Sequence, residues 1–114
     1  MIRTKRIYDD PGPADGVRVL VDRLWPRGVR KADARLDAWA KELAPSSELR
    51  RWYGHDPSRF EAFADRYRAE LRERPEVADW RRRAARETVT LLTATKDMEH
   101  AHVRVLAEAL DEGN

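Results

Sequence analysis

The sequence predicts a small α/β domain with a mostly parallel sheet of about three or four strands flanked by helices. Two apolar, β-branched runs, at 17–21 and 89–93, are typical of strands buried on both faces. Amphipathic helical patterns separate these runs, and strands joined through helices pair in parallel by crossover connections. A length of 114 residues indicates one domain spanning 1–114.

The other strands carry weaker signals. Residues 2–8 alternate in polarity and hold few apolar side chains, which indicates a strand at a sheet edge. A loop rich in Pro and Gly follows at 9–13. Residues 36–43 alternate between apolar and polar side chains, which favours a strand, although their Ala, Lys and Glu content also permits a helix. An edge strand could also pair two copies of the chain, and the sequence leaves the oligomeric state open.

Four helices are indicated by caps and by apolar residues at helical spacing. Ser46 offers an N-cap for a first helix that Gly54 can end. Asp56 followed by Pro57 suits the start of a second helix. Pro75 opens a third helix, and Asp97 is the expected cap of the last one. The inward-facing residues of the second and last helices are expected to be Phe60, Phe63, Tyr67, Leu71, Val103, Leu106, Ala107 and Leu110.

Composition excludes several classes of protein. The chain has no cysteine, which removes disulfides, thiolate metal ligands and thiol catalysis, and fits a reducing compartment. It has no apolar run long enough to span a bilayer and no apolar stretch of a signal peptide near its start, so we expect a cytoplasmic protein without a membrane partner. The formal charge is only +2, although residues 50–86 hold eleven arginines against seven acids.

Polar segments follow the predicted strands. The run Asp22–Gly28 comes after the strand at 17–21, and residues 94–97 come after the strand at 89–93. In open parallel sheets, ligands bind outside the carboxyl ends of the strands. Helix N-termini near this edge, together with Arg27 and Lys96, would favour an anion. The sequence therefore predicts a site for a small anionic ligand, phosphate- or nucleotide-like, at this edge.

Each residue of this predicted site also has a structural alternative. Asp97 and Ser46 are helix caps in the simpler interpretation, and His55 is a hydrogen-bonded loop residue. The candidates for proton transfer or other catalytic roles are Asp22, His55 and Asp97. The candidates for ligand binding are Arg23, Trp25, Arg27, Lys41, Ser46 and Lys96.

Cofactor and metal signatures are absent from the sequence. It contains no GxGxxG, no P-loop and no nucleophile elbow, so no cofactor is expected. His100 and His102 are two positions apart and point about 200° apart on a helix, so they cannot share a metal. No metal site is expected.

The run Asp22–Gly28, with Asp15–Val21 before it and Lys31 after it, resembles the signature of the YeaO-like family, filed under domain of unknown function 488. The likeness continues through Trp39, Lys41, Ala44–Ser46, Leu49–Arg50, Trp52, His55–Pro57, Phe63, Tyr67, Glu70–Leu71, Leu91–Leu92 and Lys96–Asp97. The resemblance implies a small α/β protein, bacterial and cytoplasmic, without an established activity. It also implies distinctive polar positions at Asp22, Arg23, Arg27, Lys41, Ser46, His55, Lys96 and Asp97. Two positions depart from the family pattern: Thr93 stands where relatives often have Tyr, and Ala101 where they often have Asn.

Three functions compete at this level. The first is an enzyme, or a ligand-binding relic of one, that acts on a small anion through the strand-end cluster. The second is a nucleic-acid-binding protein that uses the arginines of 50–86 with Trp25 or Trp52, and the charge of +2 argues against it. The third is a protein-interaction module with Trp25 and Pro26 as an exposed hot spot, which burial of Trp25 would exclude.

Overall fold

A four-stranded parallel sheet forms the centre of the molecule in the computed structural model, which describes residues 1–111. The strands are β1 (Ile2–Arg6), β2 (Val17–Leu20), β3 (Ala38–Trp39) and β4 (Val89–Thr93), and their order in the sheet is β1-β4-β2-β3. All neighbouring pairs are parallel. The predicted mostly parallel α/β fold is confirmed, and β1 is an edge strand as expected.

The third strand is much shorter than the sequence predicts. Of residues 36–43, only β3 pairs with β2, and Lys41–Leu43 form a 3-10 turn instead. The reason lies in the partner: β2 ends at Leu20, which aligns with Trp39, so no neighbouring strand remains for residues beyond it.

The helices are α1 (Lys31–Ala34), α2 (Ser47–Tyr53), α3 (Phe60–Arg72), α4 (Glu76–Arg86) and α5 (His102–Asp111). The caps of α2 are as predicted, because the Ser46 hydroxyl accepts the Leu49 N–H and Gly54 closes the helix in a left-handed conformation. The short helix α1 was not indicated by the sequence.

The last helix starts later than predicted. Asp97 caps a 3-10 turn, Met98–His100, by accepting the His100 N–H, and α5 begins at His102. A similar 3-10 turn, Pro57–Arg59 capped by Asp56, precedes α3. In both places the capping residue is correct, but a tight turn separates it from the helix.

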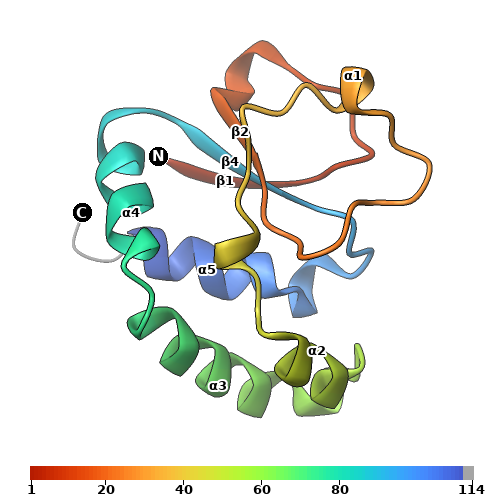
Figure 1. The fold of residues 1–114 in the computed structure, drawn as a ribbon, viewed down its shortest axis with the longest axis vertical. Coiled ribbons are helices and arrows are strands. Elements are labelled where there is room, and N and C mark those ends of the chain that lie inside the picture. Colours follow the sequence, from red (N-terminus) through yellow and green to blue (C-terminus); the bar gives the residue numbers. More distant parts are fainter. Residues whose placement is uncertain (112–114) are drawn as a thin grey trace.

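The two faces of the sheet are covered differently (Figure 1). Helices α2 to α5 pack on one face over the larger core, which includes Val19, Leu91, Phe63 and Leu106. On the other face a smaller core gathers around Leu20 and Leu92 and is covered by loop residues and α1. No helix within residues 1–111 is long and apolar enough to cross a membrane. This arrangement leaves the carboxyl ends of β2 and β4 opening between the covering loop and the helices.

Candidate functional site

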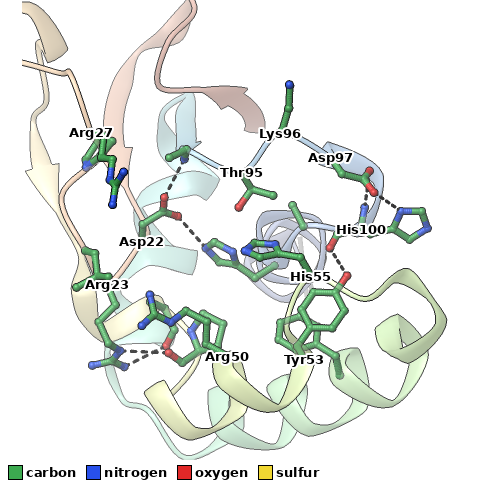
Figure 2. A pocket seen from close by; sticks show the side chains of 18 of the residues that line it. Asp22, Arg23, Arg27, Arg50, Tyr53, His55, Thr95, Lys96, Asp97 and His100 are labelled. Atoms are coloured by element: carbon green, nitrogen blue, oxygen red, sulfur yellow. Dashed lines mark hydrogen bonds and ion pairs between the residues drawn. The ribbon is translucent and has the colours of Figure 1, made fainter.

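A cavity of about 710 Å³ lies at the carboxyl ends of β2 and β4 (Figure 2). Its walls come from the loop after β2, the loop after β4, the segment before α2, α2 itself and the start of α5. Seven of the nine predicted site residues line it: Asp22, Arg23, Trp25, Arg27, His55, Lys96 and Asp97. Segments more than 70 residues apart in the sequence therefore meet at the carboxyl edge of the sheet, the place expected from the predicted strands.

The loop after β2 is held in place by two tryptophans. The Trp25 indole N–H donates to the Val29 carbonyl at 2.7 Å, and the Trp39 indole N–H donates to the Asp22 carbonyl at 2.7 Å. The two rings pack edge to face with their centroids 5.2 Å apart. Gly28, with φ of 74°, allows the chain to turn back after Arg27. Trp25 is half-buried, so it is not an exposed hot spot.

Asp22 joins the ends of the two central strands to α5. Its carboxylate accepts the Ala94 N–H at 2.8 Å and the Thr93 hydroxyl at 2.7 Å, and it lies 3.2 Å from Nε2 of His102. Burial raises the pKa of Asp22, but the hydrogen bonds from His102, Ala94 and Thr93 outweigh burial and hold the pKa below its usual value. Asp22 is therefore an ionised anchor and a weak base.

His102 is a site residue that the sequence analysis missed. Its Nε2 donates to the Val21 carbonyl at 3.0 Å as well as facing Asp22, and its ring packs edge to face on Tyr67 with centroids 6.1 Å apart. In the sequence this histidine is a candidate only as a metal ligand paired with His100, which the spacing of the two residues excludes. Its place at the start of a helix, which follows the last strand, is the signal that could have assigned it to the strand-end site.

Cationic side chains surround the cavity, and three of them have no partner. Among residues 1–111, no group pairs with the guanidinium of Arg27 or Arg50 or with the ammonium of Lys96, and all three are exposed. Arg23 instead donates to the Pro45 carbonyl at 3.2 Å. Figure 2 shows Arg27 and Arg50 approaching Asp22 from different sides of the pocket. Arg50 lies on α2 in an arginine-rich segment. It belongs to the family likeness in the sequence but was not among the predicted site residues.

Asp97 is engaged with its own turn. Its Oδ2 lies 2.7 Å from Nδ1 of His100, and the Tyr53 hydroxyl donates to the His100 carbonyl at 2.6 Å. The hydrogen bond from His100 is the main cause that holds the pKa of Asp97 below its usual value. A carboxyl group of low pKa is ionised at neutral pH, so Asp97 is a poor proton donor.

His55 has an unusual backbone. It adopts φ of 55°, in the left-handed region, directly after Gly54 in the loop that follows α2. A non-glycine residue in this region costs about 1–2 kcal/mol, and such conformations cluster at functional sites. The side chain is exposed and lies over the pocket in Figure 2, with its ring centroid 6.3 Å from that of Tyr53.

Lys41 and Ser46 are not brought to the cavity. The Lys41 ammonium lies 4.0 Å from the centroid of the Trp39 ring, because the chain enters a 3-10 turn as soon as β3 ends. The Ser46 hydroxyl caps α2 and donates to Glu70 at 2.6 Å, which ties α2 to α3. Both side chains have structural partners where the sequence predicted ligand contacts.

Both departures from the family pattern touch the site. The Thr93 hydroxyl is one of the donors to Asp22, and Ala101 lines the cavity. Within residues 1–111 no group of three or more His, Asp or Glu side chains is placed to hold a metal ion.

Comparison with known proteins gives consistent matches over nearly the whole chain. The family model described as "Inactive DUF488-N3 subclade" matches residues 1–113. An uncharacterised protein of Mycobacterium tuberculosis is 48% identical over 110 residues, which cover 96% of this chain and 93% of that protein. The uncharacterised protein YeaO of Escherichia coli is 42% identical over 113 residues, which cover 96% of each chain. No solved structure matches.

Proposed function

The chain belongs to the DUF488 family, as the sequence resemblance predicted, and on this premise we propose that it binds a small anionic ligand at the carboxyl edge of its sheet. The ligand is phosphate- or nucleotide-like. Its anionic group lies among Arg27, Arg50 and Lys96. The family model's description as inactive favours a binding protein that keeps a ligand site over an enzyme with full turnover.

The charge balance of the cavity carries this proposal. Four cationic side chains and two carboxylates line it, and both carboxylates already accept hydrogen bonds from the protein. Three of the cations have no partner within residues 1–111. Guanidinium groups that line a cavity without forming an ion pair attract an anion and gain charge-assisted hydrogen bonds when it binds. Lys96 lines the same cavity and adds to its positive charge.

The acid–base properties of the site support binding more than catalysis. A general base works best when its pKa lies near the working pH. The pKa of Asp22 and that of Asp97 are both held low instead, the first against burial by hydrogen bonds and the second mainly by the hydrogen bond from His100. His55 remains the candidate for proton transfer, with a side chain that is exposed.

The size and lining of the cavity support a ligand larger than an inorganic ion. Small-molecule sites have volumes of roughly 300–1,000 Å³, and this cavity lies well within that range. Tyr8, Trp25, Tyr53 and Phe63 contribute aromatic surface to its walls. A nucleotide-like ligand would place its phosphate among the cations and a planar group against these rings.

The nucleic-acid alternative gains no support from the arginines of 50–86. Five of them are paired with nearby carboxylates: Arg59, Arg68, Arg74, Arg82 and Arg83. Trp52 is half-buried and lies beneath the guanidinium of Arg66 at 4.0 Å from its ring centroid, so that face cannot stack on a base.

A thermal-shift series tests the proposal. Phosphate and adenosine monophosphate are titrated into the wild type, Arg27→Ala, Lys96→Ala and the control Arg51→Ala. Arg51 lies on the same helix as Arg50, is likewise exposed and does not line the cavity. A ligand at 100 times its Kd adds about 2.7 kcal/mol of stability, so we expect a rise of several degrees in wild type and Arg51→Ala. The rise should shrink in Arg27→Ala and Lys96→Ala; equal rises in all four proteins would place the anion elsewhere.

A further inference from the structure

His102 supplies an acceptor to a cavity whose other polar side chains are mostly donors. Its Nε2 lies 3.0 Å from the Val21 carbonyl oxygen. A carbonyl oxygen only accepts hydrogen bonds, so Nε2 carries the hydrogen. In the neutral imidazole the lone pair is then on Nδ1. The backbone of β2 therefore fixes which edge of the ring accepts.

Asp22 holds the ring in this orientation. Its Oδ1 is a second acceptor for Nε2–H at 3.2 Å, and the carboxylate is itself fixed by Thr93 and Ala94. A histidine whose one nitrogen is held by a carboxylate and a carbonyl has a fixed tautomer, and its other nitrogen is oriented for a further partner.

Nδ1 of His102 is open to a ligand. No residue in 1–111 forms a hydrogen bond to it, and no buried side-chain nitrogen or oxygen in this part of the chain lacks a partner. Nδ1 is therefore not buried, although the side chain as a whole is only 12% exposed. The residue is one of those that line the cavity.

We propose that His102, positioned by Asp22, accepts a hydrogen bond from a hydroxyl of a phosphate ester whose phosphate lies among Arg27, Arg50 and Lys96. This inference rests on the proposed anion site and specifies its ligand class. A ligand for this cavity carries an anionic group for the three cations and a neutral donor for Nδ1. A sugar phosphate is the simplest compound with both. Inorganic phosphate and an aryl phosphate fill only the cationic part.

Three probes separate the two parts of the site. Inorganic phosphate, phenyl phosphate and ribose 5-phosphate are titrated calorimetrically into wild type, His102→Gln and Arg27→Ala. Phenyl phosphate carries the same ester group as ribose 5-phosphate but has no hydroxyl donor. Glutamine retains an amide N–H that can still donate to Val21 and Asp22, but it has no counterpart of Nδ1.

We expect wild type to bind ribose 5-phosphate about three- to tenfold more tightly than phenyl phosphate, the effect of one hydrogen bond. His102→Gln should abolish this preference while binding inorganic phosphate as wild type does. Arg27→Ala should weaken all three. If His102→Gln still prefers ribose 5-phosphate to phenyl phosphate, or if its affinity for all three probes falls equally, the inference is overturned and the anion site stands. If wild type binds none of the probes, both fail.

A measurement on the unaltered protein covers the case in which His102→Gln fails to fold. The ¹⁵N chemical shifts of the His102 ring distinguish a protonated nitrogen from one with a free lone pair. We expect Nε2 to be the protonated nitrogen and Nδ1 to have a lone-pair shift that moves when ribose 5-phosphate, but not inorganic phosphate, is added. The inference is overturned if Nδ1 carries the proton in the free protein, or if the ¹⁵N chemical shift of Nδ1 does not change when ribose 5-phosphate is added.

Discussion

Nε2 of His102 lies 3.2 Å from Oδ1 of Asp22, and this contact joins the end of β2 to the start of α5 across 80 residues of sequence. The same carboxylate accepts from Thr93 and Ala94 at the end of β4. The Asp22 side chain thus connects β2, β4 and α5 beneath the cavity. Asp22 is therefore both a residue of the candidate site and a structural residue of the fold.

Asp22→Asn tests that structural role through its pH dependence. The pKa of Asp22 in the folded protein lies below its ordinary value of 3.8. A depressed carboxyl pKa contributes stability above the unfolded value, and this contribution is lost as the pH falls through the folded value. We expect the substitution to cost roughly 2 kcal/mol at neutral pH and the difference from wild type to shrink below about pH 4.

Urea unfolding of both proteins between acid and neutral pH measures this difference. A gap between wild type and Asp22→Asn that stays constant from neutral to acid pH would mean that the carboxylate charge does not stabilise the fold.

Ser46→Ala tests the assignment of Ser46 as a structural residue. The hydroxyl caps α2 and donates to Glu70, so its loss should cost about 1–2 kcal/mol of unfolding free energy. Phosphate binding should not change, because Ser46 does not line the cavity. Ser47→Ala, one position further into the same helix, is the control and should be nearly neutral. A loss of phosphate affinity in Ser46→Ala alone would return Ser46 to the site.

His55→Gly tests whether the His55 side chain, whose backbone is in the left-handed region, contacts the ligand. Glycine removes the strain at φ of 55° but adds freedom to the unfolded chain, so stability should rise by up to about 1 kcal/mol. Affinity for adenosine monophosphate should fall. Arg35→Gly is the matched control, since Arg35 has φ of 49° and does not line the cavity. Equal affinities in the two variants would indicate that His55 does not contact the ligand.

The sequence predicted the strands and caps well where the signal was local. Val17–Leu20 and Val89–Thr93 are buried and mostly apolar because both faces of the central strands are covered. Ser46, Gly54 and Asp56 are caps that local hydrogen bonding explains. The short β3 could not be predicted in the same way. Its length depends on where its partner β2 ends, which is a tertiary property.

The position of the candidate site could be predicted from the sequence, but the roles of its residues could not. The rule that loops meet at the carboxyl ends of parallel strands brought Asp22, Arg27 and Lys96 together. Sequence could not show that Asp22 is saturated with donors or that His102 joins it from α5, because both depend on distances between remote segments. Arg50 was missed although it lies within the family likeness, because it is on a helix and does not directly follow a predicted strand.

Binding of nucleic acid is expected to be weak. Fluorescence anisotropy of a labelled single-stranded oligonucleotide, measured at low and at physiological salt, checks this expectation. Because five of the eleven arginines of 50–86 are already paired with carboxylates, fewer of them can displace counterions from phosphates. Micromolar or tighter binding that weakens steeply with salt would favour the nucleic-acid alternative.

The location of the anion is the central claim, and a phosphate titration followed by ¹H–¹⁵N correlation spectra tests it most directly. We predict that the largest shifts fall on the backbone amides of Arg27, Thr95 and Lys96, which border the cavity from two different loops. The amides of Arg51 and Arg82, outside the cavity, should stay in place. Shifts spread over the arginines of α3 and α4, with none at Arg27 or Lys96, would contradict the proposed site.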